Sequence, residues 1–184
     1  MTSRPLSAEE GRRLLDVARE AIVARMAGRG PSAAASTPRL SEPGGAFVTL
    51  RKRRGGELRG CVGYVEPVFP LIETVARAAV AAAFEDRRFA CVTEAEWPSL
   101  SVEISAISPT RPLRPDEVEV GTDGLVIRHE GRSGLLLPQV PIEHGWDRCT
   151  FLEQLCRKAG LPKNAWRSPD VELLAFRAQV LGED

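Results

Sequence analysis

Residues 46–63 read AFVTLRKRRGGELRGCVG, and this stretch decides the predicted fold. Residues 46–52 alternate between apolar and polar side chains, which is typical of a strand with one buried face. The paired glycines at 55 and 56 indicate a tight turn, because glycine readily adopts the positive φ angles that such turns need. Residues 58–63 are therefore expected to return as the second strand of a hairpin.

The segment before this hairpin predicts a helix and a long connection. Ser7 and Glu10 have the spacing of a capping box, and apolar residues recur at helical spacing through residues 7–27. Residues 28–45 are rich in Gly, Pro, Ser and Ala, which favours a long connection or a flexible strap. We expect no domain boundary there, since a lone helix cannot bury its apolar face without the body that follows.

The rest of the chain repeats one order of elements. A helix, a strand, a second hairpin, a second helix and a closing strand are expected at residues 67–87, 100–107, 124–137, 147–160 and 173–181. This order predicts an α+β fold in which two hairpin–helix–strand halves share an antiparallel sheet with the helices packed on it. Residues 1–184 are expected to form a single domain.

The composition indicates a globular protein of the cytoplasm. The 184 residues are 43% apolar and 27% charged, with as many acidic as basic side chains. No apolar run is long enough to cross a bilayer, and the first residues do not have the pattern of a signal peptide. The four cysteines contain no Cys-x-x-Cys pair, and we expect them to be reduced thiols.

Several kinds of site lack their usual motif. The sequence has no glycine-rich phosphate loop and no His-x-x-x-His or His-Glu-x-x-His spacing, so it predicts neither a cofactor nor a metal site. Aromatic residues make up 5% and do not interleave with basic ones, which argues against a nucleic-acid surface. Arginines greatly outnumber lysines, which fits either recognition of anions or the base composition of a genome.

The residues around Cys61 form the most informative segment for function. Gly60 and Gly63 flank a thiol, and strand alternation would place Arg59 and Cys61 on the same face of the sheet. On one interpretation, Arg59 and a second guanidinium from Arg88 stabilise a reactive thiolate or bind an anion in a cleft. On the other, Cys61 is a small buried residue and its glycines make room for a packed helix.

A nucleophilic cysteine usually works with a histidine base, and the chain has only two histidines. His129 is expected at the exposed tip of the second hairpin. His144 lies in a polar segment with Gln139 and Glu143, and we predict that this segment forms one wall of the cleft beside Cys61. The alternative is that Trp146 anchors the loop in the core while the polar residues cap the next helix.

The chain resembles the AMMECR1 family over nearly its whole length. The resemblance rests on separated blocks in the right order: FVTL at 47–50, LRGCVG at 58–63, AAFEDRRF at 82–89, SGLLLPQV at 133–140, FLEQ at 151–154, KAGLP at 158–162, and Trp166. The second block matches the Leu-Arg-Gly-Cys motif suspected of function in the family, with Val62 in the place of Ile. The chain departs from the family pattern at Ala90 and Cys91, where a Pro-Pro pair is common.

The resemblance implies two β-rich halves and a set of partners. The resemblance implies that this protein is a partner of a Memo-like protein and a radical-SAM protein in the AmmeMemoRadiSam system. Two hypotheses follow. The preferred one is a binding or adaptor module that receives a partner peptide or a small anion, because a thiol without an assured base is weak evidence for catalysis. The other is a cysteine-dependent enzyme that uses Cys61 with Arg59 and His144.

Overall fold

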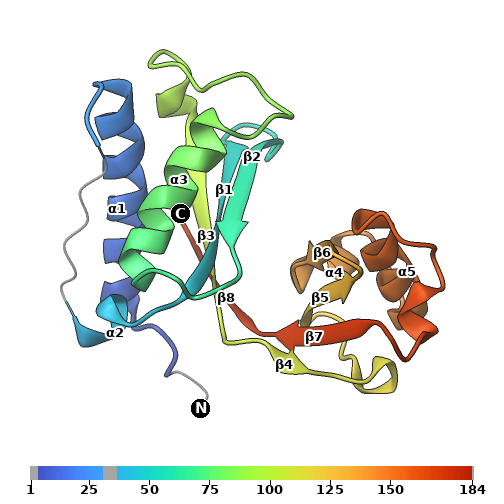
Figure 1. The fold of residues 1–184 in the computed structure, drawn as a ribbon. Coiled ribbons are helices and arrows are strands. Elements are labelled where there is room, and N and C mark those ends of the chain that lie inside the picture. The colour runs from blue at the N-terminus through green and yellow to red at the C-terminus, as the bar shows by residue number, and fades with distance from the viewer. Residues whose placement is uncertain (1–3, 31–36, 184) are drawn as a thin grey trace. The chain divides into compact units, whose positions relative to one another are not determined.

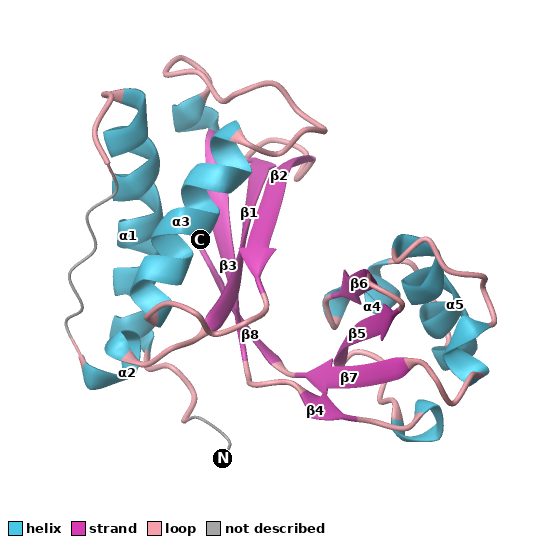
Figure 2. Cartoon of the chain, viewed as in Figure 1, coloured by secondary structure: helices cyan, strands magenta, loops and turns pink. Residues whose placement is uncertain are grey.

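The structure, a computed structural model, describes residues 4–30 and 37–183. The chain divides into two compact units (Figures 1 and 2). Unit 1 comprises Met1–Ile107 and Gln179–Asp184, and unit 2 comprises Ser108–Ala178. Unit 2 is thus a continuous insertion between two pieces of unit 1, and each unit has its own sheet.

Unit 1 is a four-stranded sheet with its helices on one face, as Figure 1 shows. The strand order is β2-β1-β3-β8, so β2 and β8 are the edge strands. The elements are α1 (Ala8–Met26), α2 (Pro38–Ser41), β1 (Gly45–Lys52), β2 (Leu58–Tyr64), α3 (Leu71–Phe84), the 3-10 helix η1 (Trp97–Ser99), β3 (Leu100–Ile107) and β8 (Ala178–Gly182).

The first helix begins at the predicted capping box. The Ser7 side chain accepts a hydrogen bond from the Glu10 amide at 3.2 Å, and the Glu10 carboxylate accepts one from the Ser7 amide at 2.8 Å. Glu10 is almost completely buried, and the hydrogen bond from the Ser7 backbone, helped by Arg4 and Thr37, lowers its pKa to about 2. The cap therefore holds a charged carboxylate at the positive end of α1.

Helix α3 packs closely on the hairpin because its buried face is built largely from alanine. Val75 and Ala79 lie in one core with Val48 and Leu50 of β1. Small side chains bring a helix backbone near a sheet, and such a close approach occurs at β2. A Cβ atom added to Gly60 would lie 2.2 Å from the carbonyl oxygen of Ala82.

Unit 2 is a smaller α+β body with the strand order β4-β7-β5-β6. Its elements are β4 (Arg111–Pro112), the 3-10 helix η2 (Pro115–Glu117), β5 (Gly124–His129), β6 (Arg132–Leu136), α4 (Gln139–Glu143), α5 (Arg148–Lys158), the 3-10 helix η3 (Ala165–Arg167) and β7 (Glu172–Phe176). Phe151 of α5 is completely buried against the apolar face of the sheet. Asp147 begins α5 as predicted, since its carboxylate accepts a hydrogen bond from the Thr150 amide.

The predicted α+β class is confirmed, but the two halves do not share one sheet, because each unit has a four-stranded sheet of its own. The structure also adds three details that the sequence did not show. The strand expected over residues 173–181 is two strands, β7 and β8, which join different sheets. The helix expected over 67–87 is shorter, because α3 begins only after Pro70. The connection expected over 28–45 contains the short helix α2, while its residues 31–36 lie outside the described part of the chain.

All four cysteines are free thiols. Across residues 4–30 and 37–183, each helix is too short or too polar to span a lipid bilayer.

Candidate functional site

Cys61 lies on the edge strand β2. Its backbone N–H and C=O point away from β1, and the side chains of Asp86 and Arg88 form hydrogen bonds with them. Its amide donates to the Asp86 carboxylate at 2.9 Å, and its carbonyl accepts a hydrogen bond from Arg88 at 3.3 Å. Asp86 and Arg88 thus pair with Cys61 much as a neighbouring strand would. An unpaired strand edge invites pairing with another chain, and this carboxylate–guanidinium pair covers the edge at Cys61.

The same two side chains form a tight ion pair. The guanidinium of Arg88 contacts both oxygens of Asp86, at 2.9 and 2.7 Å. The Asp86 side chain is only 7% exposed, yet the hydrogen bonds from Arg88 and from the Cys61 amide hold its pKa well below the usual range. The Asp86 carboxylate in turn raises the pKa of Arg88. Both groups are therefore charged at neutral pH, and the charge of each faces the other.

The Cys61 sulfur lies on the sheet face opposite to α3. Cys61 pairs with Thr49 across the hairpin, and the neighbours of Thr49 on β1, Val48 and Leu50, face the core shared with α3. The Thr49 hydroxyl lies 3.3 Å from the Cys61 sulfur and donates to it. Thr49 is buried and Cys61 half-buried, so the thiol is held by a neutral hydroxyl on a partly accessible face.

Arg59 contacts other groups than the thiol. Its guanidinium bonds both oxygens of Glu96, at 2.6 and 3.0 Å, and the carbonyl oxygen of Ala90 at 2.9 Å. The bond from Arg59 lowers the pKa of Glu96. The hairpin register also shifts here, with Leu50 opposite Gly60 and Arg51 opposite Leu58, so that Arg59 is an extra residue. The simple alternation behind the same-face prediction is interrupted at this bulge.

The two flanking glycines are required by packing within unit 1. The close approach of Ala82 leaves no space for a side chain at Gly60. At Gly63, an added Cβ would lie 2.4 Å from the ring of Phe47. The expected helix packing thus accounts for Gly60, and an aromatic ring on β1 accounts for Gly63.

The remaining predicted site residues lie in unit 2. Gln139 and Glu143 are the first and last residues of α4, and His144 follows as its C-terminal cap. The exposed imidazole of His144 stacks on Trp146, with ring centroids 4.7 Å apart and planes 16° apart. The structure therefore places Cys61, Arg59, Gly60, Gly63 and Arg88 in unit 1, and Gln139, Glu143 and His144 in unit 2. A role for any of them in binding or catalysis stays a prediction.

Comparison with known proteins matches residues 15–181 to the family model AMMECR1, so the match runs through both units. The chain belongs to the AMMECR1 family. A protein of Methanopyrus kandleri is 43% identical to it, over 97% of this chain and 91% of the relative. A protein of Methanothermobacter thermautotrophicus is 42% identical over the full length of both chains.

A crystal structure of an uncharacterized protein from Pyrococcus horikoshii has the same fold. It superimposes with a TM-score of 0.93 at 37% identity, covering 97% of this chain and 94% of that chain. The two-sheet architecture is therefore that of a solved AMMECR1-family relative.

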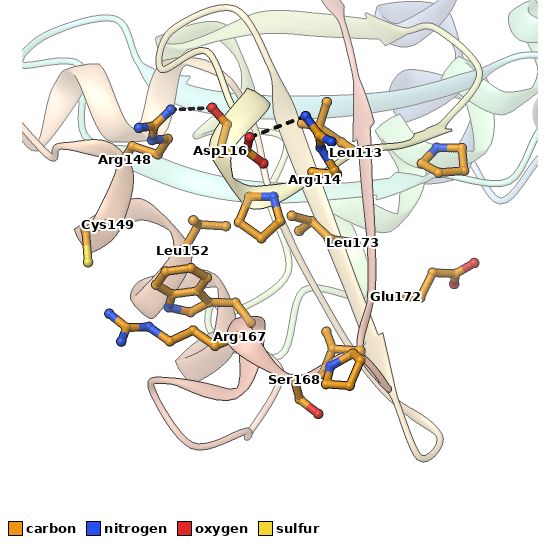
Figure 3. A pocket seen from close by; sticks show the side chains of 15 residues that line it. Leu113, Arg114, Asp116, Arg148, Cys149, Leu152, Arg167, Ser168, Glu172 and Leu173 are labelled. Atoms are coloured by element: carbon orange, nitrogen blue, oxygen red, sulfur yellow. Dashed lines mark hydrogen bonds and ion pairs between the residues drawn. The ribbon is translucent and has the colours of Figure 1, made fainter.

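Sequence reasoning missed two features of this AMMECR1-family chain. The first is the role of Asp86, which the sequence indicated only as part of a helix terminus. The second is a pocket of about 920 Å³ that lies wholly within unit 2, shown in Figure 3. Its residues come from four separate segments, so no single motif marks it. Within the described ranges 4–30 and 37–183, no three or more His, Cys, Asp or Glu side chains gather closely enough to hold a metal ion.

Proposed function

We propose that this protein is a binding module of the cytoplasm whose β2 surface receives a partner peptide or a small anion without forming a covalent bond to it. The observation that carries the proposal is the use of the charged groups around Cys61. Asp86 and Arg88 hold the Cys61 backbone and neutralise each other. Their geometry stabilises the edge of a recognition surface, and the Asp86 carboxylate accepts a hydrogen bond from the Cys61 amide.

The side chains around Cys61 within unit 1 support binding over catalysis. A general base must come within hydrogen-bond distance of the proton that it removes. In unit 1, the polar side chain at hydrogen-bond distance from the sulfur is the hydroxyl of Thr49, which is a poor base at neutral pH.

Exposed apolar side chains along β2 support a protein partner. Leu58 is 36% exposed, Tyr64 is 37% exposed and Val68 is 70% exposed, and all three lie on this edge strand or just after it. Surfaces that recognise proteins combine apolar anchors with a polar rim, and the Asp86–Arg88 pair supplies polar groups on the same strand edge. The family resemblance suggests the Memo-like and radical-SAM proteins as the partners.

The test is calorimetric titration of the Memo-like protein and the radical-SAM protein, each purified, into this protein. We expect binding to at least one of them, weakened by Val68→Asp by about tenfold or more, since burying a charge in an apolar contact is costly. Val180→Asp is the matched control, because Val180 is 50% exposed on the opposite edge strand β8 and should bind normally. Absence of binding to both partners, or equal losses in the two variants, contradicts the proposal.

A cysteine-dependent enzyme that uses Cys61 with Arg59 and His144 is the second candidate, because the thiol is half-buried rather than sealed in the core. Cys61→Ser separates the two functions, since serine keeps the size and polarity of the side chain and loses the nucleophilic sulfur. The binding module predicts normal partner affinity and normal turnover in the reconstituted system. Normal affinity with turnover abolished would establish the enzyme instead.

A further inference from the structure

The pocket of unit 2 has the size of a small-molecule site. It has a volume of about 920 Å³ and lies between the segment from β4 to η2, the N-terminal half of α5, η3 with the residues that follow it, and strand β7. Pockets that bind small ligands typically enclose about 300–1,000 Å³. All its lining residues fall within 108–178, so this pocket is complete within unit 2, whereas Cys61 belongs to unit 1.

The interior of the pocket is apolar. Leu113, Leu152 and Leu173 line it and are buried, with Leu152 contributed by α5 and Leu173 by β7. Figure 3 shows Leu152 and Leu173 pointing toward one another across the pocket. The ring of Trp166 adds an aromatic surface. A ligand that fills this space must therefore have an apolar body.

The rim carries two arginines that are not neutralised. Arg148 donates a hydrogen bond to the backbone carbonyl of Asp116, and the guanidinium of Arg167 stacks over the Trp166 ring at 4.7 Å. Within the described part of the chain, neither arginine is paired with a carboxylate. In Figure 3 they lie on the same side of the pocket, with Cys149 between them.

The acidic groups of the rim already have partners. Asp116 contacts Arg114 at 3.4 Å, and Glu172 contacts Arg128 at 3.6 Å. Arg148 and Arg167 therefore leave an excess of positive charge beside an apolar cavity. Guanidinium groups bind carboxylates and phosphates in a bidentate manner, and they do so most strongly where water is partly excluded.

We propose that this pocket binds a small amphipathic anion, with its apolar body against the leucines and its carboxylate or phosphate group held by Arg148 and Arg167. The inference does not depend on the function proposed for the Cys61 surface. The two anionic groups share the chemistry that arginine recognises, and the experiment distinguishes them.

The test titrates three ten-carbon probes, decanoate, decyl phosphate and decanol, into the full-length protein by calorimetry. We expect at least one anion to bind about tenfold tighter than decanol, since a charge-assisted hydrogen bond contributes at least that much. Arg148→Gln and Arg167→Gln should each weaken the anion by about tenfold while leaving decanol unchanged. Arg157→Gln removes the same charge from an exposed position of α5 outside the pocket, and it should bind like the wild type.

Two further measurements locate the bound probe. Ser168→Phe places a ring in the pocket without removing an arginine, and it should abolish binding of all three probes while the circular dichroism spectrum stays native. Bound anion should also slow alkylation of Cys149, which lines the pocket, and leave the rate at the exposed Cys91 unchanged. The proposal is overturned if no anion binds, if decanol binds as tightly, if Arg157→Gln loses as much as the rim variants, or if Cys149 is not protected.

Discussion

Replacing Gly60 with alanine should destabilise the protein severely, although the change adds a single methyl group. The new Cβ would lie 2.2 Å from the carbonyl oxygen of Ala82 and 3.1 Å from its carbonyl carbon. Unstrained contacts between such atoms are about 3.5 Å long, so α3 or β2 must move by roughly 1 Å. The obstacle is helix backbone and cannot rotate away as a flexible side chain would. We therefore expect a loss near the upper end of overpacking costs, about 3 kcal/mol.

Urea denaturation followed by circular dichroism measures this loss directly. Gly182→Ala is the matched control, because Gly182 lies on β8 of the same sheet and has no atom within 4 Å of an added Cβ. The control should change the unfolding free energy by no more than about 0.5 kcal/mol. If Gly60→Ala also changes the unfolding free energy by no more than about 0.5 kcal/mol, the close approach of α3 to Gly60 is wrong. Gly60 would then serve to leave the backbone of β2 accessible to a partner.

Three other perturbations test the charges and thiols described above. Glu10→Gln should lower the free energy of unfolding by about 2 kcal/mol at pH 7. The folded pKa of Glu10 is about 2, lower than its usual 4.5, so the difference between variant and wild type should vanish as pH falls from 4.5 to 2. Urea titrations at several pH values measure it. Asp86→Asn should lower the free energy of unfolding by about 1–2 kcal/mol at neutral pH, and it should weaken the loss of stability that the wild type shows as pH falls. Arg87→Gln changes an exposed neighbouring residue and should have neither effect. Iodoacetamide followed by mass spectrometry should label the exposed Cys149 early and Cys156 last, because burial excludes the reagent and raises the Cys156 pKa; equal rates would contradict the packing of α5.

Local signals in the sequence were sufficient to predict the first helix, the hairpin and α3 of unit 1. The capping box at Ser7, the glycine pair at 55 and 56 and the alanine-rich stripe of α3 each act over a few residues, and each appears in the structure. These signals work because helix caps and tight turns depend on neighbouring backbone geometry.

Features that depend on distant pairing were not predicted. The apolar run over residues 173–181 continues across Arg177 without a glycine or proline, so nothing local marks the change from β7 to β8. The bulge at Arg59 depends on its register with β1. The bond between Asp86 and the Cys61 amide joins residues that are 25 positions apart. Each of these follows from tertiary packing, which single-sequence patterns do not encode.

The sequence singled out the stretch around Cys61 as the candidate site, and a functional role for this stretch stays a prediction. Gly60 has the packing role that one interpretation gave it. The partners of Arg59 and Arg88 were not foreseen, because Glu96 and Asp86 carry no motif that distinguishes them from other surface acids. The pocket of unit 2 was missed for the same reason as the bulge, since four segments build it together.

The insertion of unit 2 between β3 and β8 has a consequence for how the protein is made. As the chain leaves the ribosome, residues 108–178 are complete before the rest of β8 has been synthesised, so unit 2 can fold while unit 1 still lacks an edge strand. Arg19 must wait for Glu183, its ion-pair partner 164 residues later in the chain. Closing so long a loop is slow, and we expect unit 1 to acquire its full stability only in the last step of folding.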